Sequence, residues 1–267
     1  MKPFKFALVL LVAALAAGVA RANEAAKKEL APTGKLRVAI GVSPAPSAFY
    51  SIKDESGKFR GLAVDLGAAL AQKLGVPVEY VPYLASGEII KAANSGVWDV
   101  TFMPVDEERK KILDFGAPYH LLQSTYLAAP GSSIKSIAEA NRAGVRIAIV
   151  ANTATSRASL KMSPNAAHLT VPGVDAAIAA MREGKADLIA LGRESIGGVA
   201  PKIAGSRILD GAILSTTTAA AVAKNKPAAL AYVSAFVEEE KAKGNVRRYF
   251  DAVGLKTATV APAGMKP

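Results

Sequence analysis

Apolar and polar positions alternate in some segments of the chain and recur at every fourth position in others. Lys35 to Val42 alternates strictly, which predicts a strand with one buried face. Leucines at every fourth position from Leu62 to Leu74 predict a helix with an apolar stripe, and Gly75 ends it. The pattern then continues as a strand at 78–81, a helix at 86–94 that Ser86 can cap, and a strand at 99–103. This alternation predicts βαβ units and an α/β fold with a largely parallel sheet.

A second passage resembles the first. Residues 89–103 and 177–191 each contain an alanine-rich helix, a glycine, two residues, an aspartate and an apolar strand. The matching residues, 88 positions apart, are Gly96 with Gly184 and Asp99 with Asp187. A glycine that stops a helix before a strand is common, so coincidence is one interpretation. Two lobes built on the same plan is the other.

The segments between and after these passages predict two crossings from one lobe to the other. A candidate crossover strand, residues 124–129, leads through the linker Pro130 to Ser133 to a strand at 146–150. The β-branched segment 212–223 is extended and returns the chain, and a helix from Pro227 to Lys243 follows. Two crossing strands form a hinge that permits closure. We expect lobe 1 to comprise 23–127 with 219–267, and lobe 2 to comprise 128–218.

The N-terminal 22 residues have the layout of a secretory signal peptide. Lys2 and Lys5 precede an apolar run from Phe6 to Ala20, and Ala20-Arg21-Ala22 is a small-x-small cleavage site. The run is shorter than the ~20 residues that span a bilayer, so we expect cleavage after Ala22. We interpret Asn23 to Thr33 as a solvated lead-in. The chain contains no cysteine, and an exported protein without disulfides suits the bacterial periplasm.

The charge changes with that cleavage. Loss of Lys2, Lys5 and Arg21 lowers the formal net charge from +11 to +8. The basic residues are spread along the chain without interleaved aromatic residues, which argues against nucleic-acid binding. A positive field of this kind favours anionic ligands.

The segment from Trp98 to Tyr119 contains the strongest candidate for ligand chemistry. Its strand carries Thr101 and breaks at Pro104, and an acidic turn then leads to Arg109. Ligands of open α/β sheets bind beyond the carboxyl ends of the strands, where a guanidinium can hold a carboxylate through two parallel hydrogen bonds. The alternative is an arginine paired with Asp106 or Glu108 on a solvated turn.

Two further loops follow strands of the predicted sheet. The loop after the first strand carries Ser47, Phe49 and Tyr50 and is a candidate wall of a pocket. The polar run from Ala151 to Ser156 precedes a helix, so its free backbone N–H groups and hydroxyls are available to an anion. Thr153 can equally cap its own helix, and the two roles are compatible.

The sequence resembles the bacterial extracellular solute-binding proteins of family 3, the polar amino-acid type that serves ABC importers. The motifs that carry the resemblance, in order, are GKLRVAI, DESGKFRGLAVDLGAALAQKLGV, SGVWDVTFM, DEERKKILDFGAPY and EGKADLIAL. The resemblance implies a periplasmic binding protein-like fold, with two α/β lobes joined by a two-strand hinge. It also implies a ligand cleft between the lobes, a membrane permease as partner, and no cofactor. We expect a monomer.

The resemblance carries site residues over unevenly. Arg109 matches the family's carboxylate-binding arginine, and Thr153 matches the second-lobe residue that also grips the carboxylate. Asn152 replaces the family's glycine before it. Pro104 replaces a serine or threonine of the first lobe, and Ser86 matches an aromatic position.

The largest departure concerns the ligand's amino group. The aspartate that receives this group in the family corresponds to Gly192 here, and Arg193 follows it. Burying an ammonium without a carboxylate costs several kcal/mol, so one hypothesis is an amine-free acid held by Arg109 and Arg193. The other hypothesis is an amino acid whose ammonium meets Glu194 or another acid.

Two other function classes remain. The same fold family includes exported dehydratases of the cyclohexadienyl type, but neither His120 nor His168 has a partner at the spacing of a catalytic base, and no metal cluster is visible. We therefore expect a binding protein and not an enzyme. A binding module for a sensory receptor has no sequence motif that separates it from an import protein.

Overall fold

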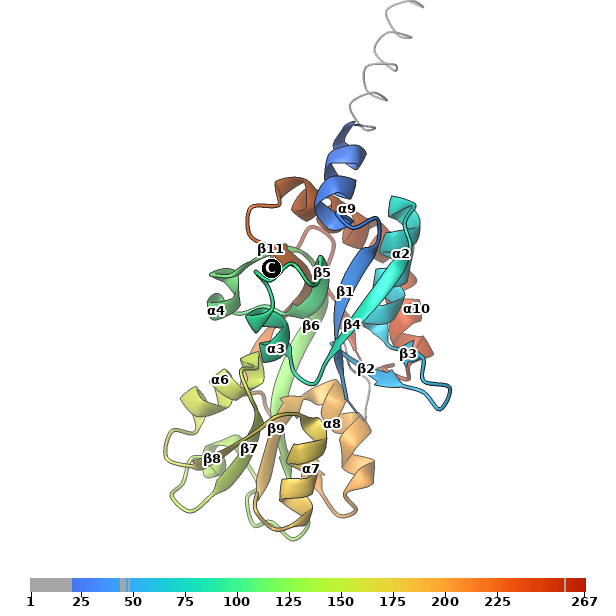
Figure 1. Cartoon of the computed structure of the whole chain (residues 1–267). Coiled ribbons are helices and arrows are strands. Elements are labelled where there is room, and N and C mark those ends of the chain that lie inside the picture. The colour runs from blue at the N-terminus through green and yellow to red at the C-terminus, as the bar shows by residue number, and fades with distance from the viewer. Residues whose placement is uncertain (1–20, 44–46, 48, 257) are drawn as a thin grey trace, which may run out of the picture.

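A computed structural model describes residues 21–43, 47, 49–256 and 258–267. Most of the expected signal peptide, residues 1–20, lies outside the described residues. Two α/β lobes make up the molecule, one above the other in Figure 1.

The elements of the upper lobe are β1 Leu36–Val42, β2 Tyr50–Lys53, β3 Phe59–Arg60, α2 Leu62–Leu74, β4 Val78–Tyr83, α3 Ser86–Lys91, β5 Val100–Pro104, α4 Glu107–Lys110, α9 Pro227–Ala242, α10 Asn245–Ala252 and β12 Thr259–Val260. The elements of the lower lobe are α5 Ile137–Ala140, β7 Arg146–Val150, α6 Ala154–Met162, β8 Ala167–Val171, α7 Val174–Arg182, β9 Leu188–Gly192, α8 Arg193–Val199, the 3₁₀ helix Ala200–Lys202 and β10 Arg207–Ile208.

Two long strands, β6 (Leu113–Ala128) and β11 (Leu214–Ala223), connect the lobes. Within the upper lobe β1 pairs in parallel with β2, β4 and β5, and within the lower lobe β7 pairs in parallel with β8 and β9. The connecting strands are antiparallel: β11 pairs with β5 and β6, and β6 pairs with β9. The expected parallel sheet is therefore confirmed within each lobe, while the crossing is antiparallel. β6 begins well before the predicted crossover at residue 124.

The leucine stripe of α2 forms the core of the upper lobe, as predicted. Leu62, Leu66 and Leu70 are fully buried against β1 and α10 neighbours such as Val38 and Phe250. Gly75 closes the helix in the left-handed conformation, with φ 65°.

The repeated glycine–aspartate motif makes the same set of hydrogen bonds in both lobes. In the upper lobe, Asp99 receives the backbone N–H of Arg37 on Oδ2 at 2.9 Å and the Arg37 Nη2 on Oδ1 at 2.7 Å. The Arg37 Nη1 donates to the carbonyl of Gly96 at 2.5 Å. The arginine at the start of β1 thereby fastens the loop that leads into β5.

The lower lobe repeats these contacts. Asp187 receives the backbone N–H of Arg146 on Oδ2 at 2.9 Å and the Arg146 Nη2 on Oδ1 at 2.6 Å, and Nη1 donates to Gly184 at 2.5 Å. Both glycines have positive φ, 69° at Gly96 and 67° at Gly184. Identical contacts at corresponding strands support the interpretation that both lobes follow one plan.

The interpretation of Asn23 to Thr33 as a solvated lead-in is wrong. Residues 21–30 are helical, and Ala26 and Leu30 are fully buried. The N-cap residue of α9 makes no side-chain capping hydrogen bond. The Glu29 carboxylate instead accepts the backbone N–H of Ala229, in the first turn of α9, at 2.8 Å. Spacing of four residues between the two apolar positions places both on the packed face.

The indole of Trp98 anchors α3 to the upper lobe. It is 2 % exposed and donates its N–H to the carbonyl of Ile89 at 3.2 Å. The N-cap of α3 is Ala85, and the Ser86 hydroxyl does not cap the helix; this corrects the predicted capping role.

None of the helices within the described residues is long and apolar enough to cross a bilayer.

Candidate functional site

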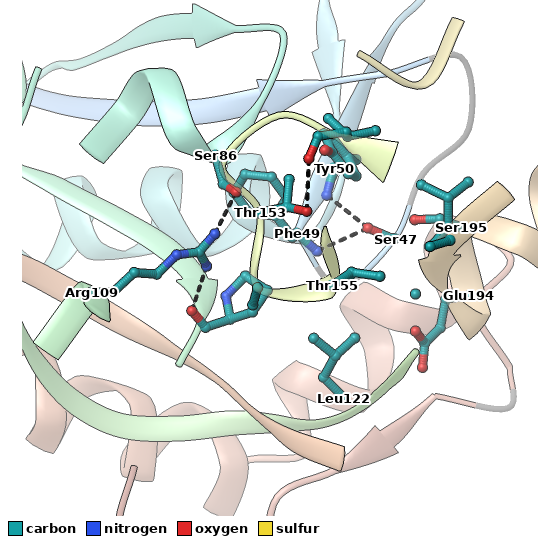
Figure 2. A pocket seen from close by; sticks show the side chains of 16 residues that line it. Ser47, Phe49, Tyr50, Ser86, Arg109, Leu122, Thr153, Thr155, Glu194 and Ser195 are labelled. Carbon is teal, nitrogen blue, oxygen red and sulfur yellow. Dashed lines mark hydrogen bonds between the residues drawn. The ribbon is translucent and has the colours of Figure 1, made fainter. Parts of the chain in front are cut away.

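A pocket of about 480 Å³, including space open to solvent, lies where the two lobes meet (Figure 2). Its walls come from the loop before β2, α3, the β5–α4 region and β6 on one side, and from the ends of β7 and β9 with the helices that follow them on the other. The lining residues are Ser47, Phe49, Tyr50, Ser86, Pro104, Arg109, Leu122, Val150, Thr153, Ala154, Thr155, Ala190, Leu191, Gly192, Glu194 and Ser195. This is the position that the carboxyl ends of parallel strands favour.

Arg109 is buried in the first-lobe wall, with 1 % of its surface exposed. The Asp106 side chain caps α4 by accepting the Arg109 backbone N–H at 3.0 Å, which fixes where the side chain begins. The guanidinium then donates from Nη1 to the Pro104 carbonyl and from Nη2 to Ser86 Oγ, both at 2.5 Å. Each of these nitrogens carries a second N–H, and guanidinium N–H groups in pairs are the donors that hold a carboxylate in the bidentate mode.

The charge of Arg109 is balanced on one side. Its Nε lies 3.2 Å from Asp106 Oδ2, close enough for an ion pair but not aligned for a hydrogen bond. Burial lowers the pKa of Arg109 to about 10, and Asp106 opposes that shift while Arg157 adds to it. The guanidinium is therefore a protonated cation at neutral pH in a wall of low polarity, where a carboxylate is held strongly.

The second-lobe wall opposite Arg109 is the first turn of α6. Thr153 and Ser156 form a capping box: Thr153 Oγ1 accepts the Ser156 N–H at 3.0 Å, and Ser156 Oγ accepts the Thr153 N–H at 3.1 Å. The Thr153 hydroxyl also donates to the Val150 carbonyl at 3.1 Å. Its hydroxyl is thus committed to the helix, and the positive end of the helix dipole faces the pocket.

The wall formed by β9 and α8 carries an acid. Glu194 stands in the first turn of α8, with 10 % of its side chain exposed. Its Oε1 lies 3.0 Å from His120 Nε2, and His120 Nδ1 lies 3.2 Å from Thr218 Oγ1. The sequence shows no partner for His120, because Glu194 is 74 positions away and the two side chains meet only in the folded chain.

Six of the candidate residues from the sequence line this pocket. They are Ser47, Ser86, Pro104, Arg109, Thr153 and Gly192. These residues lie close to the end of a strand or the start of a helix, positions that can be recognised from the sequence pattern.

Three candidates lie outside the pocket lining. Thr101 is buried inside β5, and its hydroxyl donates to Ala39 at 3.0 Å. Asn152 is exposed in a left-handed conformation, φ 56°, beside Gly87 of α3. Arg193 donates to the Gly211 carbonyl at 2.5 Å and borders a separate surface depression.

Phe49 and Tyr50, which belong to the loop predicted as a candidate pocket wall, line the pocket. Their rings meet edge to face with centroids 4.6 Å apart, and Ser47 Oγ accepts both of their backbone N–H groups, at 3.1 and 2.8 Å. Residues 44–46 and 48 of this loop lie outside the described residues. Burial raises the pKa of Tyr50, so its hydroxyl is neutral.

Within the described ranges no group of three or more histidine, cysteine, aspartate or glutamate side chains is placed to hold a metal ion. The charged residues of the pocket are instead Arg109 at one end and Glu194 at the other, and both apolar side chains and hydroxyl residues such as Ser47, Thr153 and Thr155 line the space between them (Figure 2). Small-molecule sites commonly have this composition.

The family model of the bacterial extracellular solute-binding proteins, family 3, matches residues 36–253. The chain belongs to this family. The match covers both lobes and both crossing strands, and confirms the resemblance derived from the sequence motifs.

Known relatives are amino-acid-binding proteins. The glutamine-binding protein of Geobacillus stearothermophilus is 24 % identical over 178 residues, which cover 65 % of this chain and 68 % of that protein. An ancestral amino acid-binding protein, described as a precursor of cyclohexadienyl dehydratase, superposes with a TM-score of 0.75 at 28 % identity, covering 84 % of this chain and 97 % of the other. An ancestral arginine-binding protein bound to glutamine gives 0.74 at 27 % identity, covering 83 % and 98 %. The two-lobe fold is confirmed by these structures.

Proposed function

We propose that this protein captures a small carboxylate-bearing solute, an amino acid or an organic acid, in the pocket between its lobes and delivers it to the permease of an ABC importer. The single observation that carries the proposal is the buried guanidinium of Arg109 at the pocket wall. Membership of the solute-binding family and relatives that bind glutamine or arginine support the same class of ligand.

In this proposal the ligand carboxylate bridges the lobes. Arg109 on the first lobe and the N-terminal turn of α6, at Thr153, contact it from opposite sides. A ligand that touches both walls binds the closed form more tightly than the open form, and so shifts the population toward closure. We place the lobe boundaries at 23–127 with 219–267 for lobe 1 and 128–218 for lobe 2, with β6 and β11 as the hinge.

The proposal also covers where the protein is located and its oligomeric state. Export through cleavage after Ala22 would deliver a monomer to the periplasm, where importers of this type collect their solutes. Cleavage there leaves the buried residues Ala26 and Leu30 in the mature chain.

The test is calorimetric titration of the protein and of Arg109→Ala with a panel of amino acids and their amine-free analogues. Removing one side of a buried charge pair costs about 2 to 5 kcal/mol, so the variant should lose binding by that amount. Arg142→Ala is the matched control, because Arg142 is exposed and borders a surface depression far from the pocket. Circular dichroism checks that the variants remain folded. Equal affinity of Arg109→Ala and the parent protein would refute the clamp.

One observation makes it worthwhile to test a second function, that of an enzyme. Glu194 and His120 place a carboxylate and an imidazole next to each other at the pocket, and proton transfer requires groups of this kind. We propose that the protein is not a dehydratase, since the family and its named relatives are binding proteins. A cyclohexadienyl acid such as prephenate, recovered unchanged after long incubation, is the expected result; its conversion would establish an enzyme.

A further inference from the structure

A second cavity, which we call the reverse-hinge depression, lies on the other side of the crossing strand β6. Leu122 lines the pocket between the lobes, whereas its neighbours Leu121 and Gln123 line the reverse-hinge depression. Successive side chains of a strand point to opposite faces, so β6 separates the two cavities. The depression has a volume of about 900 Å³, including space open to solvent.

Both lobes contribute walls to the reverse-hinge depression. Leu121 is paired with Thr259 of β12, which belongs to the upper lobe. Arg193 of α8 and Ile208 of β10 belong to the lower lobe. From residue 124 onward β6 pairs with β9 of the lower lobe. The depression therefore straddles the point where β6 passes from one lobe to the other.

The accessible charge in the reverse-hinge depression is the guanidinium of Arg193. One of its five N–H donors is directed at the Gly211 carbonyl, and no ion pair among the described residues includes Arg193. The Glu194 carboxylate also borders the depression, but its Oε1 lies 3.0 Å from His120 Nε2 and its Oε2 is buried. The depression therefore favours an anion, which a guanidinium binds through charge-assisted hydrogen bonds.

Apolar and neutral polar side chains complete the lining. Ile208 is 37 % exposed, and Leu121 is partly exposed. Covering both side chains would remove apolar surface from water, which is favourable. The Gln123 amide and the Thr259 hydroxyl are exposed and can donate hydrogen bonds to oxygen atoms. A carboxylate that carries an apolar chain matches all of these features.

An occupant of the reverse-hinge depression would act on the pocket through the hinge. On the pocket side the lobes touch, where Asp106 pairs with Arg157 and Gly87 lies beside Asn152. A rotation about the crossing strands that separates these contacts moves the walls of the depression toward each other. A molecule that fills the depression resists this rotation, and so favours the arrangement in which both lobes face a ligand in the pocket.

We propose that the reverse-hinge depression is an effector site for an amphiphilic carboxylate, which Arg193 and Ile208 hold and which favours closure of the pocket. The site goes beyond the proposed capture of a solute at Arg109. Its occupancy requires no ligand in the pocket, so it can be tested separately from that capture.

The probe is octanoate, and the comparison compounds are octylammonium, which reverses the charge, and acetate, which lacks the chain. NMR titration measures binding to the parent protein, to Arg193→Gln and to Ile208→Ser. Two variants serve as matched controls. Arg142→Gln removes the charge of an exposed arginine elsewhere, and Leu169→Ser removes an apolar side chain that is 38 % exposed, against 37 % for Ile208.

We expect octanoate to bind the parent protein about tenfold or more tightly than octylammonium or acetate. Arg193→Gln should lower the octanoate affinity by about tenfold, and Ile208→Ser by about threefold or more, while both controls keep the parent affinity. If Arg193→Gln fails to fold without its bond to Gly211, Ile208→Ser decides, because this exposed side chain can be replaced without opening the core.

Three results would overturn the site. Octanoate and octylammonium binding equally well, or octanoate not binding the parent protein, would remove the role of the cation. Octanoate affinity unchanged in both Arg193→Gln and Ile208→Ser would place the molecule elsewhere. Binding that is lost in Arg109→Ala but kept in Arg193→Gln would place it in the pocket between the lobes.

A distance measurement tests the effect on closure. The chain contains no cysteine, so spin labels can be attached at Lys91→Cys on α3 and Lys161→Cys on α6, which are exposed positions on opposite lobes. Saturating octanoate should shift the label separations to shorter values, and Arg193→Gln should abolish the shift. Separations that stay unchanged or lengthen with octanoate would show that the depression is not coupled to closure.

Discussion

Asp106 forms an ion pair with Arg157, which stands on α6 of the opposite lobe. The same carboxylate caps α4 and lies 3.2 Å from the Nε of Arg109. Asp106 therefore joins Arg109 of one lobe to a cation of the other. The Asp106–Arg157 pair is thus a contact between the two lobes.

Loss of the Arg157 side chain should weaken ligand binding without touching the ligand. The pair is partly exposed, with 33 % of the Arg157 side chain and 16 % of the Asp106 side chain accessible. We therefore expect Arg157→Ala to reduce affinity by about 0.5 to 1 kcal/mol, mainly through faster dissociation. Stopped-flow measurement of the dissociation rate, with Arg142→Ala as the charge-matched control, checks this. A dissociation rate equal to that of the control would show that the pair has no part in closure.

A methyl group at Gly87 should block the closed arrangement. Its Cβ would lie 2.3 Å from Asn152 Cβ and 3.1 Å from the Ala151 carbonyl, both on the other lobe. Backbone atoms cannot move aside as a flexible side chain can, so the lobes must separate. Because alanine also favours the helix over glycine, α3 itself should not be destabilised.

We expect Gly87→Ala to retain its thermal stability and to bind ligand at least tenfold more weakly, as measured by calorimetry. Gly197→Ala is the matched control, because an added Cβ there has no neighbour within 4 Å. Small-angle scattering in the presence of saturating ligand should report a more open molecule for Gly87→Ala alone. Undiminished affinity in this variant would mean that α3 and the 151–152 loop do not meet in the bound state.

The two repeated arginine–aspartate pairs should differ in their contribution to stability. The Asp99 side chain is fully buried and Arg37 is 16 % exposed, whereas Asp187 and Arg146 are 30 % and 46 % exposed. Removing one member of a buried pair leaves an unpaired charge and costs about 3 to 5 kcal/mol, against about 1 kcal/mol or less for an exposed one. Asp99→Asn should therefore lower the free energy of unfolding by at least twice as much as Asp187→Asn in urea denaturation.

The effect of Asp187 should depend on pH in a defined direction. Hydrogen bonding to Arg146 holds the pKa of Asp187 below its ordinary value of 3.8 in the folded state. The stabilisation is complete above that ordinary value and is lost as pH falls through the lower, folded-state pKa. The stability difference between the parent protein and Asp187→Asn should thus be constant from about pH 5 to 7 and shrink below about pH 4. A difference that instead grows on acidification would contradict this assignment.

Local patterns predicted those parts of the fold that depend on neighbouring residues. The α2 stripe, the helix-ending Gly75 and the paired glycine–aspartate motifs are all specified within a few positions of sequence. Ser86 illustrates the limit: its position at a helix start predicted a cap, but its hydroxyl is engaged by Arg109, 23 positions later. The contacts that decide such roles are tertiary.

The same distinction between local patterns and tertiary contacts applies to the candidate site. Arg109 could be predicted because a strand end and an acidic turn mark it locally. The contact between Glu194 and His120 could not, because the two residues are 74 positions apart and His120 stands on the crossing strand β6. Likewise, the alanine- and lysine-rich composition of residues 23–33 suggested solvent exposure, while the burial of Leu30 depends on α9, far along the chain.

Trp98 is the chain's single tryptophan. Its indole donates to the Ile89 carbonyl within α3, and the first turn of this helix carries Ser86 and Gly87, where Gly87 lies beside Asn152 of the other lobe. The protein thus has an intrinsic fluorophore in contact with the helix that borders the pocket at Ser86. If the proposed ligand binding displaces α3, we expect the emission of Trp98 to report it without a label.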